Sequence, residues 1–233
     1  MCGRFALTSP AAAIRQLVDF SNQPNFPPRY NIAPSQAVHI LRATPSVEMV
    51  MVQWGLVPPW VKPEQLRESA NRPQINARGE TVMQKPSFEN AFKRRRCLIP
   101  ADGFYEWDRK TGQPYLIRRR DRQVFFIGGL WEIWSGADGS EIESCAIITV
   151  PANDTLAHFH HRMPTIVPPT QADEWLHCPE TRAASLSPML TPAPSALFEA
   201  LPISKRVNKV AEDDEDLWRE ERVTVPASQL DLF

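Results

Sequence analysis

The sequence contains little cysteine: only four of its 233 residues, none of them in a Cys-x-x-Cys pair. Cys2, Cys97, Cys145 and Cys178 are too few and too scattered for a disulfide framework or a paired set of zinc ligands. This distribution is typical of free thiols in a reducing compartment. We therefore expect no bound metal and no other cofactor.

The sequence also lacks long apolar runs and an excess of charge. No hydrophobic stretch approaches the roughly 20 residues of a transmembrane helix, and the first twenty residues do not resemble a signal peptide. We therefore expect a soluble, cytoplasmic protein. The formal net charge of −1 argues against a generally basic nucleic-acid coat protein. A local basic groove remains compatible with it, because binding depends on the local field.

Proline and bulky hydrophobic residues are plentiful. Hydrophobic residues make up 42% of the chain, including seven Trp and eleven Phe, which is enough to form a core. The 23 prolines are about twice the roughly 5% average usage. They predict many ordered loops and few long helices.

Periodicity predicts a single α+β domain over residues 1–233, dominated by antiparallel strands with short helices packed outside. Strand-like segments cover residues 37–43, 46–54, 96–102, 104–107, 113–119, 123–134 and 143–150. Short helices are expected after Pro10, over 87–96, and around residues 175–176, where Thr170 and Asp173 resemble a capping box. Residues 55–76 are expected to form a long ordered loop, and the acidic tail at about 211–233 to be solvated.

Glu106 interrupts the aromatic run FYEW and is a candidate acid–base group. Strand alternation places it either inward beside a site or outward at a solvated edge. An inward position would raise its pKa and suit it to general acid–base catalysis. The outward position agrees with the usual exposure of charged residues.

The segment HFHHRMP supplies His158, His160, His161 and Arg162. No carboxylate or cysteine stands nearby at a metal-ligand spacing, so a proton-shuttling histidine is favoured over a zinc site.

The segment INARGET places Asn76, Arg78 and Glu80 at alternate positions. In an extended chain these side chains project to one side, as a polar site or as a solvated strand face.

Cys2 directly follows the initiator methionine. Removal of Met1 would give Cys2 an α-amine and a thiol on adjacent carbons, a 1,2-aminothiol that no other position in a protein offers.

Six segments in one order resemble the SOS-response-associated peptidase (SRAP) family, from Cys2 to about Asn208. They are MCGRF, RYNIAP, WGLVPPW, NARGET, RCLIPADGFYEW and HHRMP. The resemblance implies a curved, barrel-like sheet and a monomer without metal. It also implies recognition of abasic sites in single-stranded DNA in the DNA damage response, with association to the nucleoid. The crosslink to the ring-opened sugar would be a thiazolidine formed by Cys2.

The family's active-site residues map onto Cys2, Asn76, Glu106 and His160. Its DNA-backbone contacts map onto Arg4, Arg78, Thr149 and Arg162, and the loop residues that lie against the bases map onto Pro34 and Trp60. This chain departs from the family at two positions. His161 replaces an acidic residue that commonly follows the active histidine, and Pro59 stands where glycine is frequent.

Three other functions compete with the crosslinking hypothesis. A processing peptidase would use Cys2 as nucleophile with Glu106 and His160 beside it, and removal of its own Met1 could be its only cleavage. A non-catalytic reader of modified single-stranded DNA would need only the arginines. An N-terminal-nucleophile amidotransferase shares the MCG start but would require glutamine-binding motifs that the sequence does not show.

Overall fold

The computed structural model describes residues 2–221. Two sequence predictions concern residues outside this range: the removal of Met1, and the last part of the acidic tail, residues 222–233.

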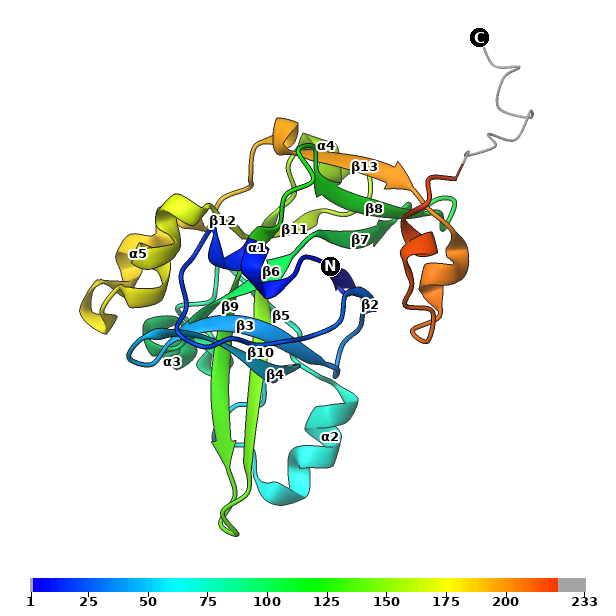
Figure 1. The fold of residues 1–233 in the computed structure, drawn as a ribbon. Coiled ribbons are helices and arrows are strands. Elements are labelled where there is room, and N and C mark those ends of the chain that lie inside the picture. Colours follow the sequence, from blue (N-terminus) through cyan, green and yellow to red (C-terminus); the bar gives the residue numbers. More distant parts are fainter. Residues whose placement is uncertain (1, 222–233) are drawn as a thin grey trace.

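Five strands form a closed ring at the centre of the molecule (Figure 1). They are β3 (Ala37–Ala43), β4 (Val47–Trp54), β6 (Arg96–Ala101), β9 (Phe125–Ser135) and β10 (Glu141–Pro151). Within the ring each strand pairs with two of the others, in the order β3, β4, β10, β9, β6 and back to β3. All these pairings are antiparallel except that of β4 with β10. Closure removes the exposed edges that an open sheet would present.

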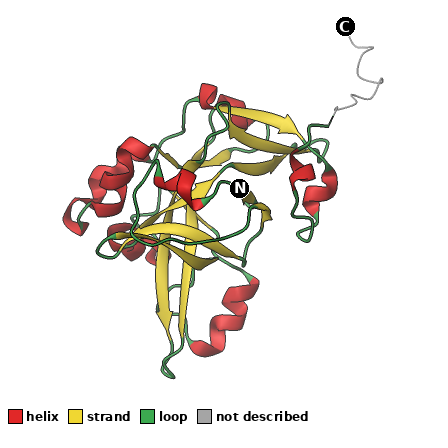
Figure 2. Cartoon of the chain, in the orientation of Figure 1, coloured by secondary structure: helices red, strands yellow, loops and turns green. Residues whose placement is uncertain are grey.

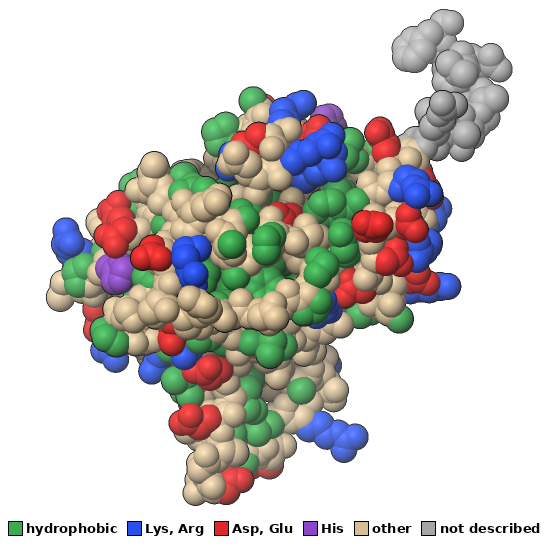
Figure 3. Space-filling view, in the orientation of Figure 1, with side chains coloured by type: hydrophobic (Ala, Val, Ile, Leu, Met, Phe, Trp, Pro, Cys, Tyr) green, Lys and Arg blue, Asp and Glu red, His purple; other side chains and the backbone are tan. Residues whose placement is uncertain are grey.

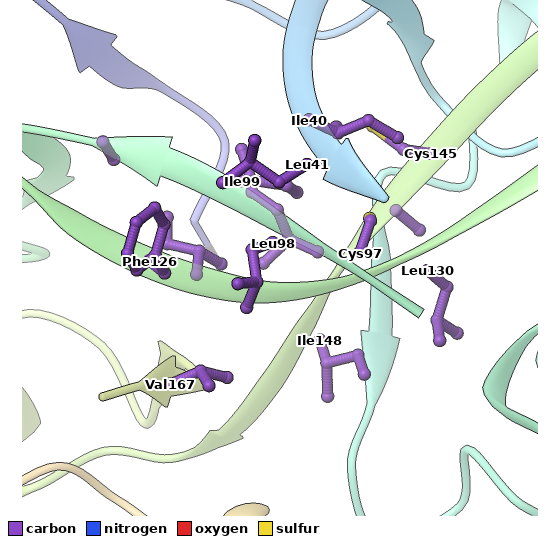
Figure 4. Packing of buried hydrophobic residues seen from close by; sticks show 14 of the residues in the cluster. Ile40, Leu41, Cys97, Leu98, Ile99, Phe126, Leu130, Cys145, Ile148 and Val167 are labelled. Carbon is purple, nitrogen blue, oxygen red and sulfur yellow. The ribbon is translucent and has the colours of Figure 1, made fainter. Parts of the chain in front are cut away.

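Apolar side chains from these strands pack together, as Figure 4 shows. Ile40, Leu98 and Ile148 are completely buried, as are the thiols of Cys97 and Cys145. Burial raises the pKa of both thiols, so they remain protonated. All four cysteines of the chain are free thiols.

A second, antiparallel sheet lies beside the barrel in the order β13, β8, β7, β1, β2. Its strands are β13 (Phe198–Pro202), β8 (Pro114–Arg119), β7 (Gly103–Trp107), β1 (Phe5–Leu7) and β2 (Arg29–Ile32). Asp102 alone separates β6 of the barrel from β7 of this sheet. Its Oδ2 accepts hydrogen bonds from the amides of Thr8 (2.6 Å) and Ser9 (2.7 Å), and so fixes the N-terminal strand at the junction.

Short helices cover the outside of the sheets (Figure 2). The expected ones are α1 (Ala11–Arg15), α3 (Pro86–Arg94) and α5 (Ala172–His177). The capping-box prediction is wrong, because Gln171 occupies the N-cap of α5 and makes no side-chain cap bond. The prediction of a plain loop over 55–76 is also wrong in part, since η1 (Pro63–Gln65) and α2 (Leu66–Asn71) lie within it.

The remaining elements are short. They are β5 (Asn76–Arg78), α4 (Asp154–Ala157), β11 (Arg162–Pro164), β12 (Ile166–Val167), η2 (Pro169–Gln171), η3 (Glu180–Met189), η4 (Ser195–Leu197), η5 (Lys205–Asn208) and η6 (Glu215–Trp218). Together the elements confirm the predicted α+β fold with a curved, mainly antiparallel sheet. No helix among residues 2–221 is long and apolar enough to cross a membrane.

The acidic segment from 211 to 221 packs against the second sheet, which corrects the prediction of a solvated tail. Asp213 Oδ1 accepts hydrogen bonds from the amides of Tyr30 and Asn31, at 2.5 and 2.8 Å, and its Oδ2 pairs with Arg29. Leu217, within η6, is fully buried. Strand β2 lies at the edge of its sheet, so some of its backbone amides have no partner strand. The carboxylate of Asp213 accepts hydrogen bonds from two of these amides.

Candidate active site

Cys2 lies shortly before β1 of the second sheet, and Asn76 of β5 hydrogen-bonds to it from the barrel side; the N-terminal end of the chain is marked in Figure 1. Strand β1 holds it there, because Phe5 pairs with Phe104 of β7 on one side and with Ile32 of β2 on the other. The Cys2 side chain is completely buried. Burial raises the pKa of its thiol, and the negative charge of Glu106 raises it further. The thiol is therefore protonated and needs a base to become a nucleophile.

Asn76 reaches Cys2 from the barrel side. It begins β5, which pairs in parallel with β10 through Ile147 and is thereby placed next to the N-terminus. Its Nδ2 donates a hydrogen bond to the carbonyl oxygen of Cys2 at 3.1 Å. Its Oδ1 is buried and has no hydrogen-bond partner among the described residues. The amide thus fixes the backbone of Cys2 and keeps one acceptor oxygen available inside the site.

Glu106 faces inward from β7, where it pairs with Tyr115 of β8. Only 4% of its surface is exposed, so the solvated edge position considered from the sequence is wrong. Burial raises the pKa of this carboxyl to about 7. A group with this pKa gains and loses protons readily at neutral pH, as a general acid–base catalyst must.

His160 follows α4, a single helical turn capped by the side chain of Asn153. Its Nδ1 accepts a hydrogen bond from the backbone amide of Arg162 at 2.9 Å. Because an amide can only donate, Nδ1 carries no proton and the neutral ring is protonated at Nε2. Burial lowers the pKa of His160 to about 4, and the charges of His161 and Arg109 act in the same direction. His160 is therefore a neutral hydrogen-bond donor near pH 7.

His161 lies against the active histidine. The rings of His160 and His161 stack, with their centroids 4.3 Å apart and an interplanar angle of 28°. Arg109, in the turn between β7 and β8, lies with its Nη2 2.9 Å from His161 Nδ1. At this position, where the family resemblance implies an acidic residue, the chain has an imidazole bonded to a guanidinium.

Arg162 and Thr149 lie inside the protein and brace the site. The guanidinium of Arg162 forms a two-pronged ion pair with Glu80 and also donates to the carbonyl oxygen of Thr149. Thr149 is 1% exposed and donates from its hydroxyl to Ala77 O at 3.3 Å. These contacts give both residues a positioning role, and their predicted contacts with DNA stay predictions.

Arg4 ties the N-terminal segment to the end of the described chain. Its Nη1 donates to Asn31 Oδ1 at 2.7 Å and to the carbonyl oxygen of Val207 at 2.8 Å. The amide of Asn31 donates in turn to the carbonyl oxygens of Val207 (3.1 Å), Lys209 (3.0 Å) and Glu212 (2.7 Å). These hydrogen bonds of Arg4 therefore fix the N-terminal segment that carries Cys2.

The other predicted DNA contacts lie nearer the surface. Arg78 is exposed at the end of β5, and Trp60 is 52% exposed in the loop that follows β4. Pro34 is half-buried after β2, and Pro59 is exposed beside Trp60. In the view of Figure 3, hydrophobic side chains gather at the centre of the face and charged ones lie mainly around its margins.

The sequence reasoning missed Arg109 and Asn31. Arg109 stands in an ordinary polar turn without a local signal, and Asn31 lies within the RYNIAP motif, which marks the segment and not the role of this residue. Their importance depends on contacts with residues 52 and 176 to 181 positions away. Within the described residues, no group of three or more His, Cys, Asp or Glu side chains could hold a metal ion.

This arrangement defines a protein whose second residue is a buried cysteine, held by the amide of Asn76 and influenced electrostatically by the buried carboxyl of Glu106. The sequence model of the family described as "SOS response associated peptidase (SRAP)" matches residues 1–210. The chain belongs to this family.

Curated relatives and solved structures agree with the assignment. The chain is 35% identical over 224 residues to the abasic site processing protein YoqW of Bacillus subtilis, covering 93% of this chain and 98% of the relative. It is 28% identical over 257 residues to the abasic site processing protein HMCES of Gallus gallus, covering 91% and 76%. A crystal structure of a protein from Bacteroides thetaiotaomicron superposes with a TM-score of 0.83 at 25% identity, covering 95% of this chain and all of the other.

Proposed function

We propose that this protein processes abasic sites in single-stranded DNA by forming a covalent thiazolidine between Cys2 and the ring-opened deoxyribose. The observation that carries the proposal is the placement of Cys2 between Asn76 and Glu106. Asn76 holds the Cys2 carbonyl, and the charge of Glu106 acts directly on the Cys2 thiol. The relatives are named abasic site processing proteins, which supports this substrate class.

The reaction begins after removal of Met1, which makes the Cys2 nitrogen a free α-amine. An abasic deoxyribose exists partly as an open aldehyde. The amine attacks the aldehyde carbon, and loss of water gives an imine. The Cys2 sulfur then bonds to the same carbon while the proton from the thiol ends on nitrogen, which closes a five-membered ring. An α-amine has a pKa of about 7.7–8.0, so a useful fraction is unprotonated near neutral pH.

Glu106 moves the protons that these steps require. With a pKa of about 7, its carboxylate form accepts a proton from the amine or thiol, and its acid form returns one to the departing hydroxyl. The free Oδ1 of Asn76 provides an acceptor for the α-amine or for a sugar hydroxyl.

His160 assists opening of the sugar ring. Its Nδ1 accepts a hydrogen bond from the Arg162 amide, so its Nε2–H is the group that donates to the substrate. Donation to the ring oxygen, together with removal of the proton from the anomeric hydroxyl, converts the closed sugar into the aldehyde.

The DNA strand is held mainly through its phosphates. Arg78 is exposed close to the site and contacts the backbone, while Trp60 offers a ring on which an unpaired base can stack. A single strand is preferred because its bases are accessible for stacking, and the protein acts as a monomer.

Incubation with an oligonucleotide that carries one abasic site tests this function. The wild-type chain is expected to give a product that survives heating and has the mass of protein plus DNA minus water. Cys2→Ser retains the amine but forms no thiazolidine, so its product should be transient. Abundant heat-stable product from Cys2→Ser would refute the ring. Cleavage of peptides without crosslinking would favour the peptidase instead.

A further inference from the structure

The pair formed by Arg109 and His161 is not explained by the crosslinking chemistry. Both side chains are exposed and lie beside His160, whose ring stacks on that of His161. Arg109 can only donate hydrogen bonds, so its contact at 2.9 Å makes His161 Nδ1 an acceptor. The proton of the neutral His161 ring is therefore on Nε2.

Arg109 is presented by a well-ordered turn. Asp108 Oδ1 accepts hydrogen bonds from the amides of Lys110 and Thr111, at 2.9 and 2.8 Å. Gly112 has a φ of +67°, a conformation that glycine adopts without strain and that lets the chain turn back into β8. The guanidinium is consequently held at a defined place on the rim of the site.

The positive charge around this pair is only partly balanced. Among the described residues no carboxylate forms an ion pair with Arg109 or Arg78, while Arg162 is paired with Glu80. Desolvation lowers the pKa of His161, and the positive charges of Arg109, Arg162 and Arg78 lower it further. Glu106 and Glu80 interact electrostatically with Arg109 and Arg78, so these cations are balanced only in part, and the neutral His161 donor beside Arg109 is suited to an anion.

We propose that Arg109 and His161 together bind one backbone phosphate of the DNA strand, next to the abasic sugar. This rests on the proposed function, which brings the sugar to the adjacent His160. The guanidinium of Arg109 and the Nε2–H of His161 donate to the phosphate oxygens. An acidic side chain at position 161 would repel that phosphate, so this contact distinguishes the chain from relatives that carry an acid there.

Binding of a single strand containing a tetrahydrofuran abasic analogue tests the proposal, because the analogue has no aldehyde and cannot crosslink. A series of strands would each carry one neutral methylphosphonate at a different position around the analogue. For the wild-type protein, one position should weaken binding about fivefold to tenfold. Arg109→Gln should bind the unmodified strand more weakly by a similar factor and lose its sensitivity at that position. In a plot of the logarithm of the binding constant against the logarithm of the salt concentration, the magnitude of the slope should be smaller by about 0.7 for Arg109→Gln than for wild type.

Arg120→Gln provides the matched control. Arg120 is an exposed arginine without an ion pair in the described part of the chain, at the opposite end of β8 from the Arg109 turn. Its removal should change neither the affinity nor the sensitivity at the chosen phosphate.

Two results would overturn the phosphate site. One is an Arg109→Gln protein that stays as sensitive as wild type to every methylphosphonate. The other is unchanged binding with slower crosslinking, which would mean that the pair orients His160. Failure of the crosslinking function has a separate signature: the wild-type protein would give no covalent product with an aldehyde-bearing strand.

Discussion

At the scale of single residues, burial acts in opposite directions on the two titrating groups of the site. It raises the pKa of Glu106 to about 7 and lowers that of His160 to about 4. Both shifts favour the neutral form, because a charge is poorly solvated there. Glu106 is consequently the group whose protonation changes near neutral pH, and His160 stays a neutral donor.

The crosslinking rate should report the ionisation of Glu106. We expect the single-turnover rate of the wild-type protein to rise with pH through an inflection near 7, as the carboxylate base forms. Glu106→Gln should lack this inflection and be slower by about 10²-fold. Crosslinking reactions quenched at successive times and resolved on gels give the rates of both proteins from pH 5 to 9. Persistence of the same inflection in Glu106→Gln would assign it to another group, such as the α-amine.

Glu106 should also reduce stability at high pH. Its pKa is higher in the folded than in the unfolded chain, so its contribution is fully present below the unfolded pKa. It is lost as the pH rises through about 7. Relative to wild type, Glu106→Gln should therefore gain about 2 kcal/mol in free energy of unfolding between pH 5 and pH 8. Urea denaturation at the two pH values checks this, and an equal pH dependence of both proteins would contradict it.

His161 should keep the pKa of His160 low. Replacing it by aspartate introduces a negative charge where the ring now stacks, which stabilises the imidazolium form of His160. The pKa of His160 should therefore rise in His161→Asp. Nitrogen NMR of labelled histidines from pH 4 to 8 follows the titration and also identifies the Nε2–H tautomer expected for the neutral ring. Identical titration curves in the two proteins would show that residue 161 does not influence its neighbour.

At the scale of elements, strand β2 depends on the acidic segment that covers it. Asp213→Ala would leave the amides of Tyr30 and Asn31 without their acceptor, at a cost of about 1–3 kcal/mol. Asp216→Ala is the control, since its carboxylate makes only an exposed pair with Arg219 and should contribute less than about 1 kcal/mol. Urea denaturation of both variants compares them. Equal free energies of unfolding for Asp213→Ala and Asp216→Ala would mean that the acidic segment covers β2 without stabilising it.

The sequence predicted the elements whose signals are local. The strands over 37–43 and 96–101 and the helix after Pro10 are marked by alternation or by a proline start, and they lie where expected. Helix α2 was missed because the mixed segment LRESAN has no apolar face to signal it. The inward position of Glu106 could not be settled by alternation, which allows either side of a strand. The roles of Arg109 and Asn31 arise only from tertiary contacts.

At the scale of the whole molecule, the aminothiol exists only in the processed chain. An intact-mass measurement of the purified protein should show the loss of Met1. A preparation that crosslinks abasic DNA while retaining methionine on every molecule would rule out the thiazolidine. A variant with an extra residue between Met1 and Cys2 should fold, and it should fail to form the heat-stable product because its α-amine and thiol are no longer on adjacent carbons.

The hydrogen bonds from Arg4 and Asn31 to the carbonyl oxygen of Val207 join the first residues of the chain to some of the last. During synthesis on a ribosome, Arg4 leaves the exit tunnel 203 residues before its partner Val207, and Asn31 leaves it 176 residues before the same partner. The contacts that fix the N-terminal segment, which carries Cys2, are therefore completed only when almost the entire chain has been made. A nascent or prematurely terminated chain carries Cys2 without these contacts, so under the proposed function the order of translation delays the positioning of the residue that reacts.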